Sequence, residues 1–148
     1  MFFAIALLLS SASAAGQQFE AKIEVSDAVR IKGKFLDAFE AENKRNFSFL
    51  RSYGSVENLG ARVTDLVLSD KSGQTLTYKK LVDGEFLADG DFTAWNYKIN
   101  LDAPQNLSAR AHVSWLEGEQ GILMLGDLLP QFGETARARV ALVLPAGW

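Results

Sequence analysis

The chain has 148 residues, enough for one domain with a sizeable hydrophobic core. Its 15 lysine and arginine residues stand against 18 aspartate and glutamate residues, giving a net charge of −3, and the two signs are interspersed. Without a basic stripe, the composition argues against a nucleic-acid partner. The chain has no cysteine, which excludes disulfides and cysteine-based metal sites within it.

The first 15 residues have the pattern of a secretory signal peptide. An apolar stretch at residues 2–9 is followed by small residues, among which Ala12 and Ala14 suit the two cleavage positions. The segment is short for a bilayer span, so we expect no permanent membrane span. We expect an exported bacterial protein, periplasmic or extracellular, with a single domain at residues 16–148. A buried first strand is the alternative for residues 1–15.

Alternation of apolar and polar residues predicts an all-β fold. Strands are expected at residues 19–25, 29–35, 47–53, 61–69, 75–82, 92–101, 108–115 and 137–144. The first two form a hairpin or one bent strand. The Asp-Lys-Ser-Gly turn at residues 70–73 joins the fourth and fifth strands as a second hairpin. About eight short strands predict an antiparallel β-sandwich or a curved extended sheet. Residues 35–46 are expected to form a loop with at most one helical turn.

Residues 114–130 form the most apolar interior segment. The run from Ile122 to Leu125 is apolar at every position and predicts a buried strand, followed by an ordered loop at residues 126–130. Introducing a charge through Leu125→Asp should then unfold the domain. Asp127 is expected to cap the loop backbone or to contact a neighbouring domain. As a cap, its replacement by alanine should cost about 1 kcal/mol.

The sequence carries no catalytic or metal-binding motif. The single histidine, His112, excludes a zinc helix with two histidines, and no nucleophile elbow or phosphate-binding loop is present. We interpret His112 as a surface or groove residue. The acidic neighbours Glu117 and Glu119, and likewise Asp89 and Asp91, are interpreted as solvated turn residues. We therefore predict no catalytic, cofactor-binding or metal-binding residue in this chain.

Three aromatic residues lie at alternating positions in predicted strands. Trp95, Tyr97 and Trp115 each stand beside aliphatic residues, which favours core packing. The alternative is an aromatic platform for sugar or peptide. Trp115 and Asp127 are the candidate contacts with a neighbouring domain or a ligand.

A set of segments in fixed order carries a family resemblance. They are residues 58–63 (NLGARV), 69–73 (SDKSG), 95–98 (WNYK), 111–116 (AHVSWL), 123–130 (LMLGDLLP) and 139–148 (RVALVLPAGW). Together they resemble the N-terminal β domain of secreted bacterial metallopeptidases of the M61 (glycyl aminopeptidase-like) family. The likeness extends over residues 19–148.

The resemblance implies a non-catalytic module that precedes a thermolysin-like zinc domain with a His-Glu-x-x-His helix, often followed by a PDZ domain. No position here matches that helix, so zinc is expected only in a catalytic domain outside this sequence. The module would pack on that domain of the same full-length chain and help shape a cleft for peptide substrate. The alternative is a free-standing periplasmic β-sandwich that binds peptide or carbohydrate through an exposed Trp95, Tyr97 or Trp115. An independent enzyme is the least favoured interpretation, because the chain has a single histidine.

Overall fold

The computed structural model describes residues 19–26, 28–36, 45–118, 120–133 and 138–145. The predicted signal peptide at residues 1–15 lies outside the described residues, as does most of the loop predicted at 35–46. Within the described part of the chain, no helix is long and apolar enough to cross a membrane. Strands dominate, which confirms the all-β prediction.

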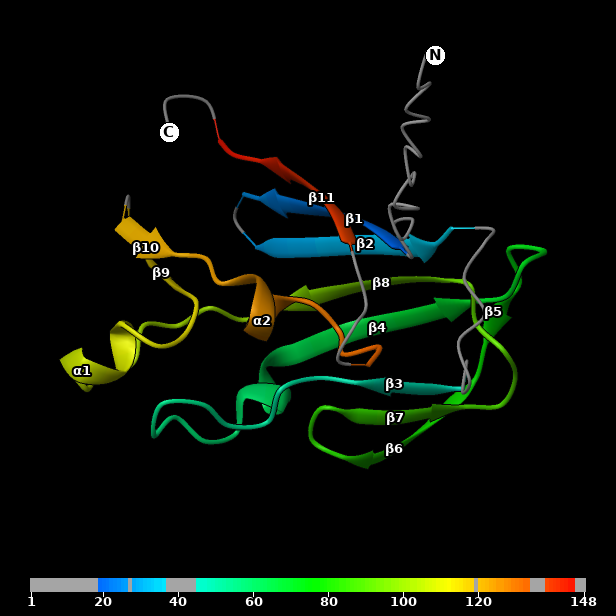
Figure 1. The fold of residues 1–148 in the computed structure, drawn as a ribbon, viewed down its shortest axis with the longest axis horizontal. Coiled ribbons are helices and arrows are strands. Elements are labelled where there is room, and N and C mark those ends of the chain that lie inside the picture. Colours follow the sequence, from blue (N-terminus) through cyan, green and yellow to red (C-terminus); the bar gives the residue numbers. More distant parts are fainter. Residues whose placement is uncertain (1–18, 27, 37–44, 119, 134–137, 146–148) are drawn as a thin grey trace, which may run out of the picture.

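Six strands form the larger sheet (Figure 1). In spatial order they are β11 (Ala138–Val143), β1 (Phe19–Val25), β2 (Val29–Phe35), β8 (Ala94–Ile99), β4 (Val63–Ser69) and β5 (Thr75–Leu76). β11 runs parallel to β1, whereas the other neighbouring pairs are antiparallel, so the sheet is mixed. The first two predicted strands form a hairpin, with Val25 opposite Val29.

A smaller antiparallel sheet packs against the larger one. Its order is β3 (Asn46–Ser48), β7 (Glu85–Ala88) and β6 (Tyr78–Val82). From β3, the Phe47 ring lies 5.8 Å from Trp95 and 6.1 Å from Tyr97, both on β8. Trp95 is 3% exposed and Tyr97 is fully buried, so the core-packing interpretation of these two residues is confirmed. The core therefore lies between the two sheets.

The predicted strand at residues 75–82 is divided between the two sheets. Its first two residues pair with β4 as the predicted hairpin requires, and the turn between them has the expected chemistry, since Asp70 accepts from the Ser72 N–H. From Tyr78 onward the chain pairs with β7 instead. The change of partner occurs at Thr77, whose carbonyl accepts the Asp89 N–H. A single alternating run thus serves two sheets.

Three further strand predictions are wrong in part. The expected strand at residues 108–115 is instead a short helix, α1 (Leu107–Arg110), because the Asn106 side chain accepts the Ser108 N–H and starts a helical turn. A separate hairpin of β9 (Trp115–Glu117) and β10 (Gln120–Ile122) follows. Of residues 47–53, Phe47 and Ser48 belong to β3. A 3-10 turn, η1 (Leu59–Arg62), replaces the start of the next predicted strand and leads into β4.

The expected buried strand from Ile122 to Leu125 is also wrong. β10 ends at Ile122, which is 36% exposed, and Leu125 begins a second short helix, α2 (Leu125–Leu128). Leu125 is 50% exposed, whereas Leu128 is fully buried. Because Leu128 and Leu129 fill the core beneath this segment, Leu125 is left on the outside of the turn.

Candidate functional site

A buried carboxylate, Asp127 in α2, forms the centre of a polar cluster. Its side chain is 3% exposed, and one oxygen, Oδ2, accepts from Arg62 Nη2 at 3.0 Å and from the Ser114 N–H at 2.7 Å. The other oxygen, Oδ1, accepts from the Ser114 hydroxyl at 2.6 Å. Both oxygens are hydrogen-bonded and the charge is paired, as burial of a carboxylate requires.

Arg62 joins three parts of the chain. Beyond Asp127, its guanidinium donates to the carbonyl oxygens of Leu59 at 3.3 Å and Ser114 at 3.0 Å. Arg62 is the last residue of η1, Ser114 precedes β9, and Asp127 lies in α2. The ion pair therefore fixes α2 and the approach to β9 against the start of β4.

Two more contacts hold α2 in place. The Ser114 hydroxyl accepts the Met124 N–H at 2.6 Å, just before the helix begins. At the other end, the buried Tyr97 hydroxyl donates to the Leu128 carbonyl. Burial raises the pKa of Tyr97 well above its ordinary value, so this donor stays protonated at neutral pH. α2 is tied in this way to β8, inside the larger sheet.

These contacts revise the expected role of Asp127. The carboxylate does not cap its own loop, because its backbone donor is Ser114, 13 residues earlier in the chain. It is also buried, so any influence on a neighbouring domain would act through the position of α2. The residues at positions 126–130 are ordered in the way the sequence predicts, but as a helical turn followed by buried Leu129 and Pro130.

Trp115, the other candidate contact residue, is half-buried at the start of β9. Its indole N–H donates to the Arg110 carbonyl at 2.8 Å, and the Arg110 guanidinium lies 5.0 Å from the ring centroid. Arg110 is itself held by Glu117 at 2.8 Å. A cation therefore covers one face of the ring. A contact between Trp115 and a neighbouring domain or ligand stays a prediction.

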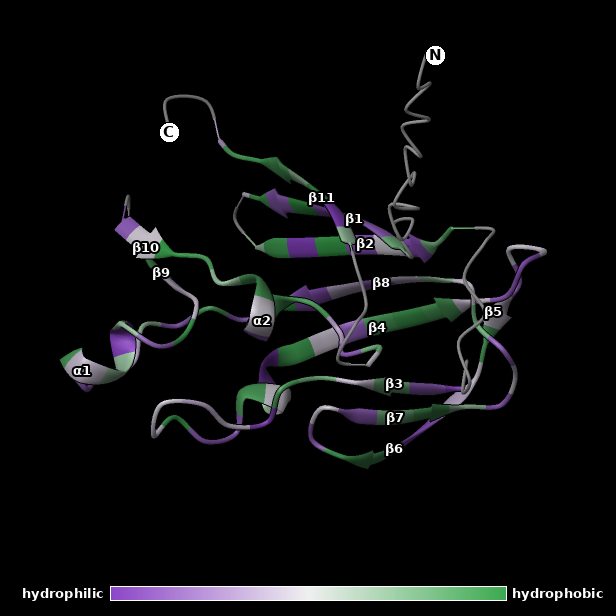
Figure 2. Ribbon diagram, viewed as in Figure 1, coloured by the Kyte–Doolittle hydropathy of each residue, from purple (hydrophilic) through white to green (hydrophobic). Residues whose placement is uncertain are grey.

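An exposed apolar segment lies at the end of β11 and includes the residue that follows it. We name Leu142, Val143 and Leu144, which are 50%, 44% and 40% exposed, the β11 strip. Leu142 is in register with Ile23, so both side chains lie on the core face of the sheet. Ile23 is only 1% exposed, whereas Leu142 is 50% exposed. Figure 2 shows the hydrophobic colouring continuing along β11. On the core face of β11, Val140 packs against the core, whereas Leu142 lacks the cover that Ile23 receives.

The remaining candidates show no arrangement for chemistry. His112 is exposed and lies beside the Tyr53 ring, at 6.3 Å between centroids, which agrees with a surface role. Asp89 accepts the Thr77 hydroxyl, Asp91 is exposed, and Glu119 lies outside the described residues. In the described part of the chain, no three His, Cys, Asp or Glu side chains come together as metal ligands would. These residues therefore do not fit a zinc ion.

Sequence reasoning missed Arg62 and Ser114. Each belongs to a different segment of the family resemblance, residues 58–63 and 111–116, and Asp127 belongs to a third, residues 123–130. The structure brings these three segments together through the polar cluster. One signal of this cluster is visible in the sequence, a charged residue, Arg62, next to a predicted apolar strand. Its partner Asp127 lies 65 residues further along the chain, so no local spacing pattern could identify the pair.

One solved structure shares the fold. It is the crystal structure of an aminopeptidase N family protein from Idiomarina loihiensis, which aligns with a TM-score of 0.61 at 10% sequence identity. The alignment covers 84% of this chain and 22% of that chain. No family model matches this sequence, and no curated protein matches it. The chain thus has the fold of one part of a larger aminopeptidase N family protein. It spans about a fifth of the length of that protein.

Proposed function

We propose that this chain is a non-catalytic β module of a larger exported zinc metallopeptidase of the M61 type. In this proposal it packs on the catalytic domain of the same polypeptide and helps shape the cleft for a peptide substrate. The zinc and the catalytic residues belong to that neighbouring domain. The observation that supports the proposal is the fold shared with 22% of an aminopeptidase N family chain, because in that protein the fold is one part of a longer chain.

The β11 strip supports a docked neighbour. Leu142 lies on the core face of the sheet and is 50% exposed, although a sheet face of this kind is normally covered. β11 is also an edge strand, and within the described residues no further strand pairs with its outer edge. An apolar edge is an aggregation hazard in a free-standing domain. A catalytic domain placed against it would remove both exposures.

The alternative function, a free-standing module that binds peptide or carbohydrate, retains only Trp115 of its three expected aromatic contacts. Trp95 and Tyr97 are buried in the core, and Trp115 has one face covered by Arg110. No aromatic platform of these three residues is therefore open to a ligand.

The coding sequence tests the proposal most directly. We expect the reading frame to continue past Trp148 into a segment that contains His-Glu-x-x-His. The full-length protein should then bind zinc and hydrolyse peptides, and alanine substitution of either histidine should abolish both properties. A stop codon directly after Trp148 would overturn the proposal.

A further inference from the structure

The outer face of the larger sheet, opposite the core, carries an excess of positive charge. The cations on this face are Lys22, Arg30, Lys32, Lys34, Lys98 and Arg139, and the described acids are Glu20, Glu24 and Asp65. The whole chain, by contrast, has a net charge of −3. Basic residues are thus concentrated on one sheet face of an acidic protein.

Ion pairs use the acids of this face and leave part of the positive charge uncompensated. Glu20 pairs with Lys34 at 3.1 Å, Glu24 with Lys22, and Asp65 with Lys98 at 2.6 Å. Among the described residues, no carboxylate lies within ion-pair distance of the other cations of this face, Arg30, Lys32 and Arg139.

The pKa of Glu24 reflects the same positive field. The hydrogen bond and the charge of Lys22 lower this pKa most, and the charges of Lys32 and Arg30 lower it further. The pKa of Asp65 is likewise lowered, first by its hydrogen bond with Lys98 and then by the charge of Lys98, with a smaller effect of Arg30. An acidic group brought to this face would meet the same attraction.

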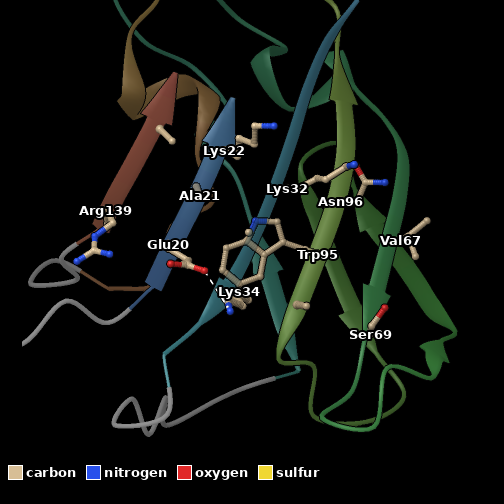
Figure 3. A pocket seen from close by; sticks show the side chains of 13 residues that line it. Glu20, Ala21, Lys22, Lys32, Lys34, Val67, Ser69, Trp95, Asn96 and Arg139 are labelled. Carbon is tan, nitrogen blue, oxygen red and sulfur yellow. Dashed lines mark ion pairs between the residues drawn. The ribbon is translucent and has the colours of Figure 1, made fainter. Parts of the chain in front are cut away.

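A groove of about 560 Å³ crosses this face over β11, β1, β2, β8 and β4. Figure 3 shows Lys22, Lys32, Lys34 and Arg139 around it, with Glu20 joined to Lys34. The floor is low because the outward-facing residues Ala94 and Ala141 are small. Gly33 contributes only backbone to the floor, because its Cβ position faces the core, 2.5 Å from the Trp95 indole. The groove thus combines an apolar floor with cationic walls.

We propose that this groove binds an extended acidic segment of a partner protein. Carboxylates of such a segment would pair with Lys32 and Arg139, which line the groove from β2 and β11. Small or apolar side chains between the carboxylates would lie on the floor formed by Ala94 and Ala141. This proposal does not depend on the proposed catalytic domain, because every residue that lines the groove belongs to this chain.

The groove suits a polypeptide better than a nucleic acid or a lipid surface. A phosphate backbone needs a continuous basic surface, and Glu20 interrupts this one. A flat anionic membrane would not reach the apolar floor between the raised lysine side chains. An extended peptide with spaced carboxylates fits both the interrupted positive charge and the apolar floor.

Binding by the full chain tests the proposal through fluorescence anisotropy. The probe is a fluorescein-labelled peptide of about ten residues with alternating Asp and Ala, compared with Ser-Ala and Lys-Ala peptides of equal length. We expect the Asp peptide alone to bind, and its affinity to fall at about 0.5 M salt because added ions screen the charges.

Three variants locate the site. The double variant Lys32→Glu with Arg139→Glu should weaken binding of the Asp peptide by about tenfold or more. Ala94→Leu should weaken it without any change of charge, by raising the floor. Lys79→Glu, an exposed lysine on β6 in the smaller sheet, is the matched control and should leave the affinity within about twofold.

Several results would overturn the proposal. Equal binding of the Lys peptide, or equal losses in the double variant and in Lys79→Glu, would show that the groove is not the site. Binding to phosphatidylglycerol vesicles or to a DNA duplex in place of the peptide would assign the charge to another partner. Thermal melting of each variant confirms that the comparison is made on folded protein.

Discussion

The ion pair between Arg62 and Asp127 ties α2 to the start of β4. The side chains are 16% and 3% exposed, so both charges are largely removed from water. Such a pair contributes little net stability, but the loss of one partner leaves the other charge buried without compensation. Ser114 adds two hydrogen bonds to the carboxylate, through its N–H and its hydroxyl. This residue-scale network is what a substitution disturbs.

Asp127→Ala should lower the free energy of unfolding by about 3 kcal/mol, because Arg62 and Ser114 lose their acceptor. This exceeds the loss expected of a backbone cap. Urea denaturation provides the measurement, with Asp91→Ala as control, since Asp91 is exposed in a turn and should change stability by less than about 0.5 kcal/mol. Equal effects of the two substitutions would contradict the role assigned to the cluster.

Gly33→Ala should destabilise the domain by about 2 kcal/mol, because the added Cβ would stand 2.5 Å from the Trp95 indole and force this packed ring to move. Gly126→Ala is the matched control. A Cβ at Gly126 meets nothing within 4 Å, and alanine favours the helical conformation of α2, so stability should be unchanged or rise by up to about 1 kcal/mol. Differential scanning calorimetry of both variants gives the comparison.

At the scale of the element, α2 is a single helical turn whose orientation comes from its tertiary contacts. A helix this short has no independent stability in water. Asp127 and Leu128 point inward, and the Leu128 carbonyl accepts from the Tyr97 hydroxyl on β8. Leu125 is consequently directed outward, which reverses the expectation drawn from its apolar neighbours.

Leu125→Asp should therefore change the free energy of unfolding by less than about 0.5 kcal/mol, because the side chain is 50% exposed. Leu128→Asp, three residues later, should unfold the domain, since it would bury an unpaired charge in the core. Circular dichroism melting curves of the two variants separate these outcomes. A large loss of stability in Leu125→Asp would restore the buried-strand interpretation.

The anchoring of α2 by β8 should also appear in the pH dependence of stability. Burial raises the pKa of Tyr97 above its ordinary value near 10, so ionisation is harder in the folded state than in the unfolded state. Stability should be fully present below about pH 10 and fall as the pH rises beyond it. Tyr97→Phe should cost about 1 kcal/mol at neutral pH through its lost hydrogen bond, yet show a smaller decline at high pH.

At the scale of the molecule, the domain buries one face of its larger sheet incompletely. The smaller sheet and α2 cover the core face over β1, β2, β8 and β4, whereas β11 extends past them with the β11 strip exposed. The opposite face is basic and grooved. The two faces therefore suit different partners, an apolar neighbour at the edge and an acidic segment on the outer face.

In the proposed full-length protein, Leu142→Lys combined with Leu144→Lys should separate this domain from the proposed catalytic domain, because it places two charges in an apolar contact. Small-angle X-ray scattering should then report a larger radius of gyration, while the melting of this domain stays unchanged. Leu107→Lys is the control, since Leu107 is 77% exposed on α1, away from β11. An unchanged radius of gyration in the double variant would place the interface elsewhere.

Local patterns in the sequence were enough to predict part of this molecule. The alternation in β1, β2 and β8 and the Asp70 turn depend on neighbouring residues only, so fold class, hairpin and core side chains could be inferred. The family resemblance also selected the segments that meet at Asp127. By itself, the sequence thus determined the all-β class, the inward face of its regular strands and the lack of catalytic motifs.

The tertiary structure alone decided the rest, because those features depend on which distant surfaces come together. Whether Leu125 is buried depends on how Leu128 and Leu129 fill the core, and the partner of Asp127 lies 65 residues away at Arg62. The change of sheet at Thr77 depends on its contact with Asp89. The basic groove exists only because β11 and β2, distant in the chain, lie on either side of β1 in one sheet.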